Sequence, residues 1–217
     1  SFPIHTIYTL GDIVGYGPNP NECVKLVRKM KMKAIKGNHE RGLTNEDFLA
    51  NFNPLAAKII QWTKQSLTAE NFDYLKDLPE KIADNQISYV HGSILDSDKY
   101  ILESTDVIEE IEELRRQKLL IEFFGHTHMK IVYVEEEGMV LPKEKWIGVN
   151  HSKIYLINPG SVGQPRDRDP LASYLVFDPE KKRILFRRLK YDVNKTIEKM
   201  KRENFPPFTY NRLKMGL

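Results

Sequence analysis

The 217-residue sequence contains a single cysteine, Cys23. One thiol cannot form an internal disulfide, and it cannot build the thiolate cage of a structural zinc site. The sequence also has no apolar run long enough to cross a membrane and no signal-like segment, so we expect a cytoplasmic protein that does not enter a membrane. Cys23 itself is expected to fill space in the core.

A strong excess of charge of either sign is also missing. The 33 basic and 30 acidic side chains give a formal net charge of +3, which is too small to form a nucleic-acid surface unless the charges cluster locally. Hydrophobic residues at 41% and charged residues at 29% are ordinary for a globular chain and unlike disordered, collagenous or membrane chains. We expect one domain over residues 1–217.

Several short apolar runs end abruptly in polar turns that contain glycine. This pattern predicts strands that carry reactive residues at their C-terminal ends. The runs are residues 7–10, 33–35, 87–90, 119–124 and 154–157.

Helical periodicity separates these runs and predicts an α/β class of fold. Shorter strands after Lys130 predict a largely antiparallel second half. The expected architecture is a layered αββα sandwich of two mixed sheets flanked by helices. In the helix expected at 106–118, the apolar side chains, Ile108 among them, should face the core, and the glutamates should be solvated. The expected helices are residues 21–30, 53–65, 106–118 and 193–200.

Five polar side chains follow four of these runs and form a donor set suited to a pair of divalent cations. Such a pair, about 3.5 to 4 Å apart, needs a shared anionic oxygen and further ligands on each ion. Oxygen ligands beside imidazole nitrogens suit Mn, Fe, Ni or Zn better than Ca or Mg. The candidate metal ligands are Asp12, Asn38, His91, His126 and His128.

The motifs that carry these residues resemble the signature of the calcineurin-like metallophosphoesterases. The ordered motifs are Gly11-Asp12, Gly37-Asn38-His39-Glu40, His91-Gly92 and Gly125-His126-Thr127-His128. Residues 11–20 and 158–167 resemble the small single-domain bacterial and archaeal phosphodiesterases of that superfamily, and the likeness runs nearly end to end. The resemblance implies a bridging role for Asp12, places His128 on the first metal, and assigns the other ligands, Asn38, His91 and His126, to the second.

The resemblance also implies a reaction. Two divalent metal ions, with Mn expected first, would hold a bridging hydroxide that attacks phosphorus, with Asp12 and His39 as catalytic residues. His39 is the implied general acid, because a leaving alkoxide needs a proton and an imidazole titrates near neutral pH. Arg166 and Arg41 are candidates for binding the charged substrate. The expected substrates are small phosphodiesters or nucleotides.

One family motif is missing from the sequence. Family members open with an Asp-x-His motif some tens of residues before the Gly-Asp, and this motif resembles the source of two ligands for the first metal. Without it, Asp12 and His128 would be the main ligands of that cation. Because Ser1 is not a natural start, we expect a first βα unit to be missing from this sequence.

Two other functions stay open at this point. A catalytically inactive protein-binding scaffold on the same fold would be expected to lose His39 or an imidazole of the 125–128 motif, whereas the sequence keeps them. A nuclease of the superfamily would be expected to carry a capping domain and a pronounced basic surface, so a nucleic-acid partner is not favoured. The oligomeric state is not indicated.

Overall fold

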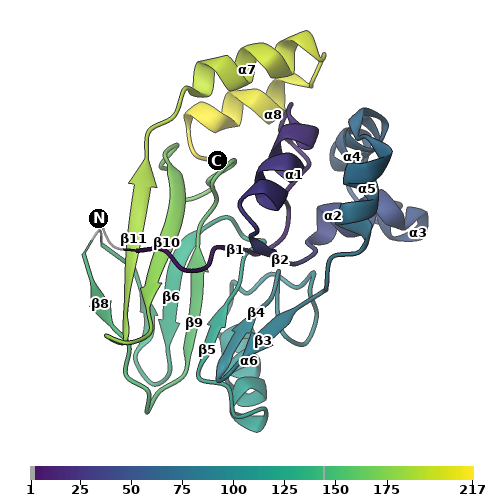
Figure 1. Cartoon of the computed structure of the whole chain (residues 1–217). Helices are drawn as coiled ribbons and strands as arrows, with labels where there is room; N and C mark the ends of the chain where they lie inside the picture. Colours follow the sequence, from purple (N-terminus) through teal and green to yellow (C-terminus); the bar gives the residue numbers. More distant parts are fainter. Residues whose placement is uncertain (1–2, 144) are drawn as a thin grey trace.

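The computed structural model describes residues 3–143 and 145–217 as helices and mixed sheets (Figure 1). Helices α1 to α5 follow the first strands, α6 lies in the middle of the chain, and α7 and α8 lie near its end. The helices are α1 Pro20–Lys29, α2 Asn38–Thr44, α3 Glu46–Leu49, α4 Pro54–Ser66, α5 Ala69–Lys76, α6 Ser104–Arg116, α7 Val193–Arg202 and α8 Pro207–Asn211, with a short 3-10 helix at Arg212–Lys214.

The strands form three hydrogen-bonded sheets within the described residues. The largest has the order β3-β4-β5-β9-β6-β7, in which β4, β5 and β9 run parallel and the outer pairings are antiparallel. A second sheet, β10-β11-β8, is antiparallel, and β1 pairs only with β2, in parallel. The strands are β1 Tyr8–Thr9, β2 Lys33–Ala34, β3 Ile82–Asp84, β4 Ile87–Tyr89, β5 Ile121–Phe123, β6 Lys130–Val134, β7 Gly138–Val140, β8 Ile147–Gly148, β9 Tyr155–Pro159, β10 Ala172–Asp178 and β11 Arg183–Leu189.

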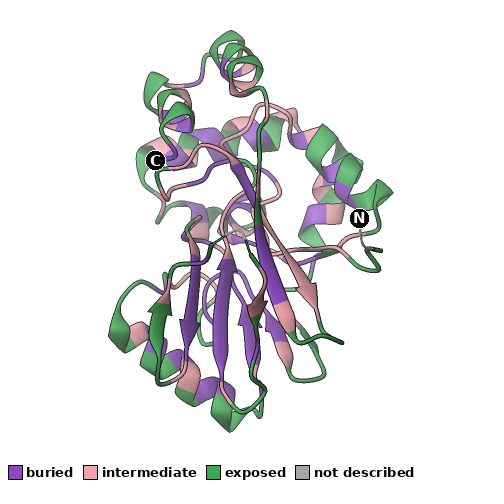
Figure 2. Cartoon of the chain, turned by 90° about the vertical axis from the view of Figure 1, so that its left-hand side faces the viewer, coloured by how far each residue is buried: buried purple, intermediate pink, exposed green. Residues whose placement is uncertain are grey.

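Apolar side chains are buried on both faces of the six-stranded sheet. One face packs against β11 through residues such as Phe123, Ile157 and Phe186, and the other face packs against α6 through Leu114 and Leu156. Burial of each such side chain stabilises the fold by about 2 kcal/mol before the loss of chain entropy is counted. Figure 2 shows the resulting buried central strands, with exposed surface on the outer helices. The sheets therefore form a rigid base for the loops at their ends.

The α/β class, the strands before the polar turns and the antiparallel second half are confirmed, as are the four predicted helices, to within two residues at most ends. The structure refines the prediction of two mixed sheets, because β1 and β2 form a small sheet of their own. Helices α2, α3, α5 and α8 were not predicted. None of the helices in the described part of the chain has the length and apolarity needed to cross a bilayer.

Two predictions about burial were wrong. Cys23 is exposed on α1. On α6, Glu110 is buried and Ile108 is 56% exposed. The Glu110 carboxylate accepts hydrogen bonds from the Ser93 hydroxyl and from the Ile94 N–H at 2.5 Å. These partners offset the cost of burying the carboxylate, so the helix can present this face to the sheet.

The strand ends converge at one edge of the six-stranded sheet, below α1 and α2 in Figure 1. The parallel strands β4, β5 and β9 all end there, and the loop after β1 lies beside them. The Tyr8 ring stacks on the Tyr89 ring with centroids 3.9 Å apart, and His91 Nδ1 hydrogen-bonds to the Leu10 carbonyl at 2.6 Å. These contacts bring the loops after β1 and β4 together, where open α/β sheets commonly bind ligands.

Candidate metal centre

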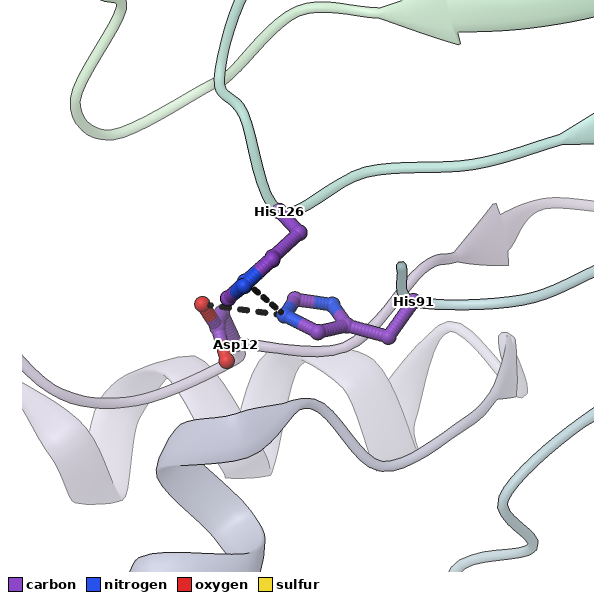
Figure 3. Close-up of side chains that lie close together, drawn as sticks. All are labelled: Asp12, His91 and His126. Carbon is purple, nitrogen blue, oxygen red and sulfur yellow. Dashed lines mark hydrogen bonds and ion pairs between the residues drawn. The ribbon is translucent and has the colours of Figure 1, made fainter. Parts of the chain in front are cut away.

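The side chains predicted to bind metal meet at this edge. Asp12, His91 and His126 offer ligand atoms that all lie within 4.8 Å of one another, and Figure 3 shows the three side chains converging from separate loops. His91 Nε2 lies 3.0 Å from both Asn38 Oδ1 and His126 Nδ1, and 3.4 Å from Asp12 Oδ2. His128 Nε2 lies 3.9 Å from Asp12 Oδ2. All five candidates therefore belong to one cluster.

A tight turn positions Asp12. Its φ is +52°, in the left-handed region, and its Oδ1 accepts the His39 N–H at 3.1 Å, at the start of α2. That carboxylate satisfies a free N–H of the first helical turn and interacts favourably with the helix dipole. A Cβ on Gly37 would lie 2.2 Å from Asp12 Oδ1, so only glycine allows this approach.

The Glu40 side chain stabilises the same turn, a role that was not predicted from the sequence. Its buried carboxylate accepts the backbone N–H groups of Asp12 and Gly37, each at 2.8 Å, and of Val14 at 3.2 Å. Burial and the nearby Asp12 charge raise the pKa of Glu40. The position of Glu40 in the Gly37-Asn38-His39-Glu40 motif is the feature of the sequence that could have indicated this role. Glu40 therefore couples the loop after β1 to α2.

Each clustered imidazole is oriented by a backbone carbonyl on its far side. His91 Nδ1 bonds the Leu10 carbonyl at 2.6 Å, and His128 Nδ1 bonds the Gln164 carbonyl at 2.7 Å. His126 hydrogen-bonds to the Asp98 backbone. Such bonds orient each ring, so the nitrogen that faces the cluster can bind a cation once it carries no proton.

The electrostatics of the cluster are dominated by one carboxylate among imidazoles. Burial acts to raise the pKa of Asp12, but the charges of His39 and His91 hold it well below its usual range. Burial acts to lower the pKa of His91, but the Asp12 charge raises it to about 9. Burial and the charge of His91 lower the pKa of His126 to about 3, and burial lowers that of His128. Asp12 is thus an anion beside neutral His126 and His128 imidazoles, and cation binding would require His91 to release its proton.

The described residues offer unequal donor sets to the two predicted metals. The second metal has four converging donors, from Asp12, Asn38, His91 and His126, with the mixture of oxygen and nitrogen that transition metals accept. The first metal would lie beside His128 and share Asp12, and these two are its predicted ligands among residues 3–143 and 145–217.

His39 lies at the margin of the cluster and lines the adjoining cavity. Its Nδ1 is 2.8 Å from the Val14 carbonyl, and its Nε2 is 3.9 Å from Asp12 Oδ2. Gly15, with φ +92°, makes room for the ring, because a Cβ there would lie 2.1 Å from His39 Nδ1. The second ring nitrogen therefore faces the Asp12 carboxylate.

The two predicted arginines occupy different environments. Arg166 lines the cavity and hydrogen-bonds to Gln164 Oε1 at 2.8 Å, and no carboxylate of residues 3–143 or 145–217 pairs with it. Arg41 is not among the lining residues; its guanidinium pairs with Asp98 at 2.6 Å and covers the Phe48 ring at 4.6 Å. Arg166 is thus available to an anion, whereas Arg41 holds the cavity wall together.

The cavity next to the cluster has a volume of about 320 Å³. Sequence reasoning missed several of its lining residues, because aromatic and amide side chains in loops carry no motif. Tyr100 lies against His126 with ring centroids 3.9 Å apart, and Tyr16 packs edge-on to His39 at 4.9 Å. The lining residues not predicted are Tyr16, Phe48, Asn51, Phe52, Asn53, Ala56, Asp98 and Tyr100.

A mixed α/β fold that gathers a carboxylate, an amide oxygen and imidazoles at its strand ends is typical of metal-dependent hydrolases. Residues 1–182 match the family model described as the calcineurin-like phosphoesterase superfamily domain. The chain therefore belongs to the calcineurin-like phosphoesterase superfamily, as its motifs predicted.

Known proteins similar to this chain support that membership. An uncharacterized protein of Methanocaldococcus jannaschii is 37% identical over 98% of this chain and 87% of its own length. The crystal structure of a metallophosphoesterase from Sphaerobacter thermophilus is 35% identical, with a TM-score of 0.88 over 99% of this chain and 89% of that one. A hypothetical protein from Pyrococcus horikoshii OT3, at 20% identity and a TM-score of 0.81 over 99% and 86%, shares the fold.

Proposed function

We propose that this protein hydrolyses small phosphodiesters or nucleotides with divalent cations, manganese first among them, at the cluster around Asp12. The observation that carries the proposal is the convergence of Asp12, Asn38, His91 and His126 beside a cavity that also contains His39 and Arg166. When bound, the cations would supply an activated water and would stabilise negative charge on the phosphoryl oxygens.

His39 is proposed to give a proton to the departing oxygen. The bond between its Nδ1 and the Val14 carbonyl fixes the ring, so the proton available for transfer is on Nε2. The Asp12 carboxylate lies 3.9 Å from that nitrogen, so Nε2 faces the cluster. General acid catalysis of this kind contributes about 10²- to 10⁴-fold to a rate.

Arg166 is proposed to bind a phosphoryl oxygen of the substrate. Its backbone N–H donates to the His128 carbonyl at 3.1 Å, and its side chain is fixed by Gln164, so the guanidinium is held next to the cluster. A fixed and unpaired guanidinium is well suited to phosphate, because its planar donors match two oxygens at once.

A hydrolysis screen in the presence of manganese tests the proposal. Phosphodiesters, phosphomonoesters and nucleotides would be offered to the protein and to Asp12→Asn, His39→Ala and Arg166→Ala. We expect a loss of at least about 100-fold for the first two and about 10- to 100-fold for the third. His151→Ala, at an exposed position, is the matched control. Equal turnover by all five proteins would refute the catalytic assignment.

A further inference from the structure

The cavity beside the cluster has one wall that phosphoryl chemistry does not need. Residues 48–56, from α3 to the first turn of α4, contribute Phe48, Asn51, Phe52, Asn53 and Ala56 to it. This wall carries no ionisable group. Resting on the proposed function, we propose that it binds the base of a nucleotide substrate, whose phosphate lies at the cluster and Arg166.

Two aromatic rings give this wall a preformed surface. The Phe48 and Phe52 rings contact each other edge to face, with centroids 5.5 Å apart and an angle of 72°. Arg41 covers Phe48 at 4.6 Å and is itself held by Asp98, so the Phe48 ring is fixed. The Phe52 centroid lies 6.5 Å from that of His39. An aromatic ring this close to the proposed proton donor can stack on a base whose phosphate reacts.

Two amide side chains provide polarity without charge. Asn53 Oδ1 accepts the Ala56 N–H at 2.9 Å, and Asn51 Nδ2 donates to the Asp47 carbonyl at 3.2 Å. The remaining polar atoms of these amides, the Asn53 N–H groups and Asn51 Oδ1, have no hydrogen-bond partner within residues 3–143 and 145–217. The wall therefore offers a donor and an acceptor, the combination that the edge of a nucleobase requires.

The size of the cavity limits what can bind. At about 320 Å³ it lies at the lower end of the roughly 300 to 1,000 Å³ usual for small-molecule sites. This volume suits one nucleotide rather than an extended nucleic-acid chain. The lining residues combine aromatic rings, amides and one unpaired arginine, which matches a base and a phosphate within one small ligand.

Two diesters with the same leaving group test the inference. The p-nitrophenyl ester of adenosine 5′-monophosphate and p-nitrophenyl methyl phosphate differ only in the nucleoside, so the ratio of their kcat/KM values measures recognition of the nucleoside. We expect a ratio of about ten or more in favour of the nucleotide ester, the order that stacking on an aromatic ring provides. A ratio near one would overturn the inference.

Substitutions locate that recognition on the wall. Phe52→Leu removes the ring, and Asn53→Ser removes the amide donor while keeping an oxygen that can cap α4. Each should lower the kcat/KM ratio at least about threefold. Asn45→Ser is the matched control, because Asn45 caps α3 by accepting the Phe48 N–H at 2.9 Å and does not line the cavity. An unchanged ratio in Phe52→Leu and Asn53→Ser would contradict the inference.

A binding measurement separates this inference from the proposed function. If neither ester is hydrolysed, the proposed function fails, and equilibrium dialysis of adenosine 5′-monophosphate against ribose 5-phosphate then decides on the base site. Tighter binding of the nucleotide by about tenfold, weakened by Phe52→Leu but not by Asn45→Ser, would support the base site. Equal binding of the two phosphates would reject it.

Discussion

Single residues set the geometry of the cluster, and those that touch no substrate matter as much as the candidate ligands. Asp12 adopts a left-handed backbone conformation, as do His126 and His128 at φ +61° and +59°. Such conformations are costly for residues other than glycine and persist only where the surroundings enforce them. Around Asp12 the enforcing group is the Glu40 carboxylate.

Glu40→Gln should therefore damage both stability and activity. The amide keeps the shape of the carboxylate but loses its charge, and an NH2 group replaces one of the two oxygens that accept the N–H groups of Asp12, Val14 and Gly37. We expect a loss of about 2 kcal/mol in the free energy of unfolding, measured in urea, and a roughly 10- to 100-fold lower kcat/KM. Glu46→Gln, on an exposed position of α3, serves as the control. If Glu40→Gln had the wild-type free energy of unfolding and the wild-type kcat/KM, the turn at Asp12 would not depend on the Glu40 carboxylate.

At the scale of elements, the contact between β5 and α6 contains an unusual buried acid. Glu122 is fully buried in the middle of β5, with the Glu110 carboxylate of α6 beside its own carboxyl group. Burial and the negative charge of Glu110 raise the pKa of Glu122 well above its usual range. Folding therefore favours the neutral acid at this position.

This arrangement gives the β5–α6 contact a pH dependence with a defined sign. Because the folded state keeps the Glu122 proton and the unfolded state releases it near pH 4, stability decreases as the pH rises above that value. Glu122→Gln, which is always neutral, should gain stability relative to the wild type at pH 8, and the difference should shrink toward pH 4. Urea unfolding at both pH values measures this, with Glu109→Gln on the exposed face of α6 as the control. A gain of equal size at both pH values would argue against the buried neutral acid.

At the scale of the whole molecule, the cluster joins segments that are distant in sequence. Its donors come from loops after β1, β2, β4 and β5. A bound cation would therefore connect the small β1–β2 sheet to the six-stranded sheet. A ligand that binds the folded state alone stabilises it by mass action. Metal binding should therefore be visible in global stability.

Manganese at 100 times its dissociation constant should stabilise the protein by about 2.7 kcal/mol, which raises the Tm by roughly 5 to 10 °C for a chain of this size. Asp12→Asn should remove most of this shift, because the anionic oxygen is lost. Thermal unfolding with and without manganese, followed by a chelator, provides the measurement. If manganese raised the Tm of Asp12→Asn by the same amount, the stabilising metal would lie elsewhere. A rise in Tm that the chelator does not reverse would also contradict binding at this cluster.

The sequence alone predicted the strands that end at the cluster, four of the helices and the residues that meet there. Strand ends can be recognised because apolar runs stop at polar, glycine-containing turns, and parallel strands bring those ends to one edge. Asp12, Asn38, His91, His126 and His128 could thus be predicted as neighbours before any distance was known.

Only the tertiary structure decided what surrounds them. A helical period does not specify how α6 rotates against the sheet, so Glu110 and Ile108 took the opposite places from those predicted. The hydrogen bonds of the Glu40 carboxylate and the cavity wall formed by residues 48–56 depend on which groups lie nearby after folding. Contacts of this kind join positions tens of residues apart, and local patterns carry no information about them because they arise from chain packing.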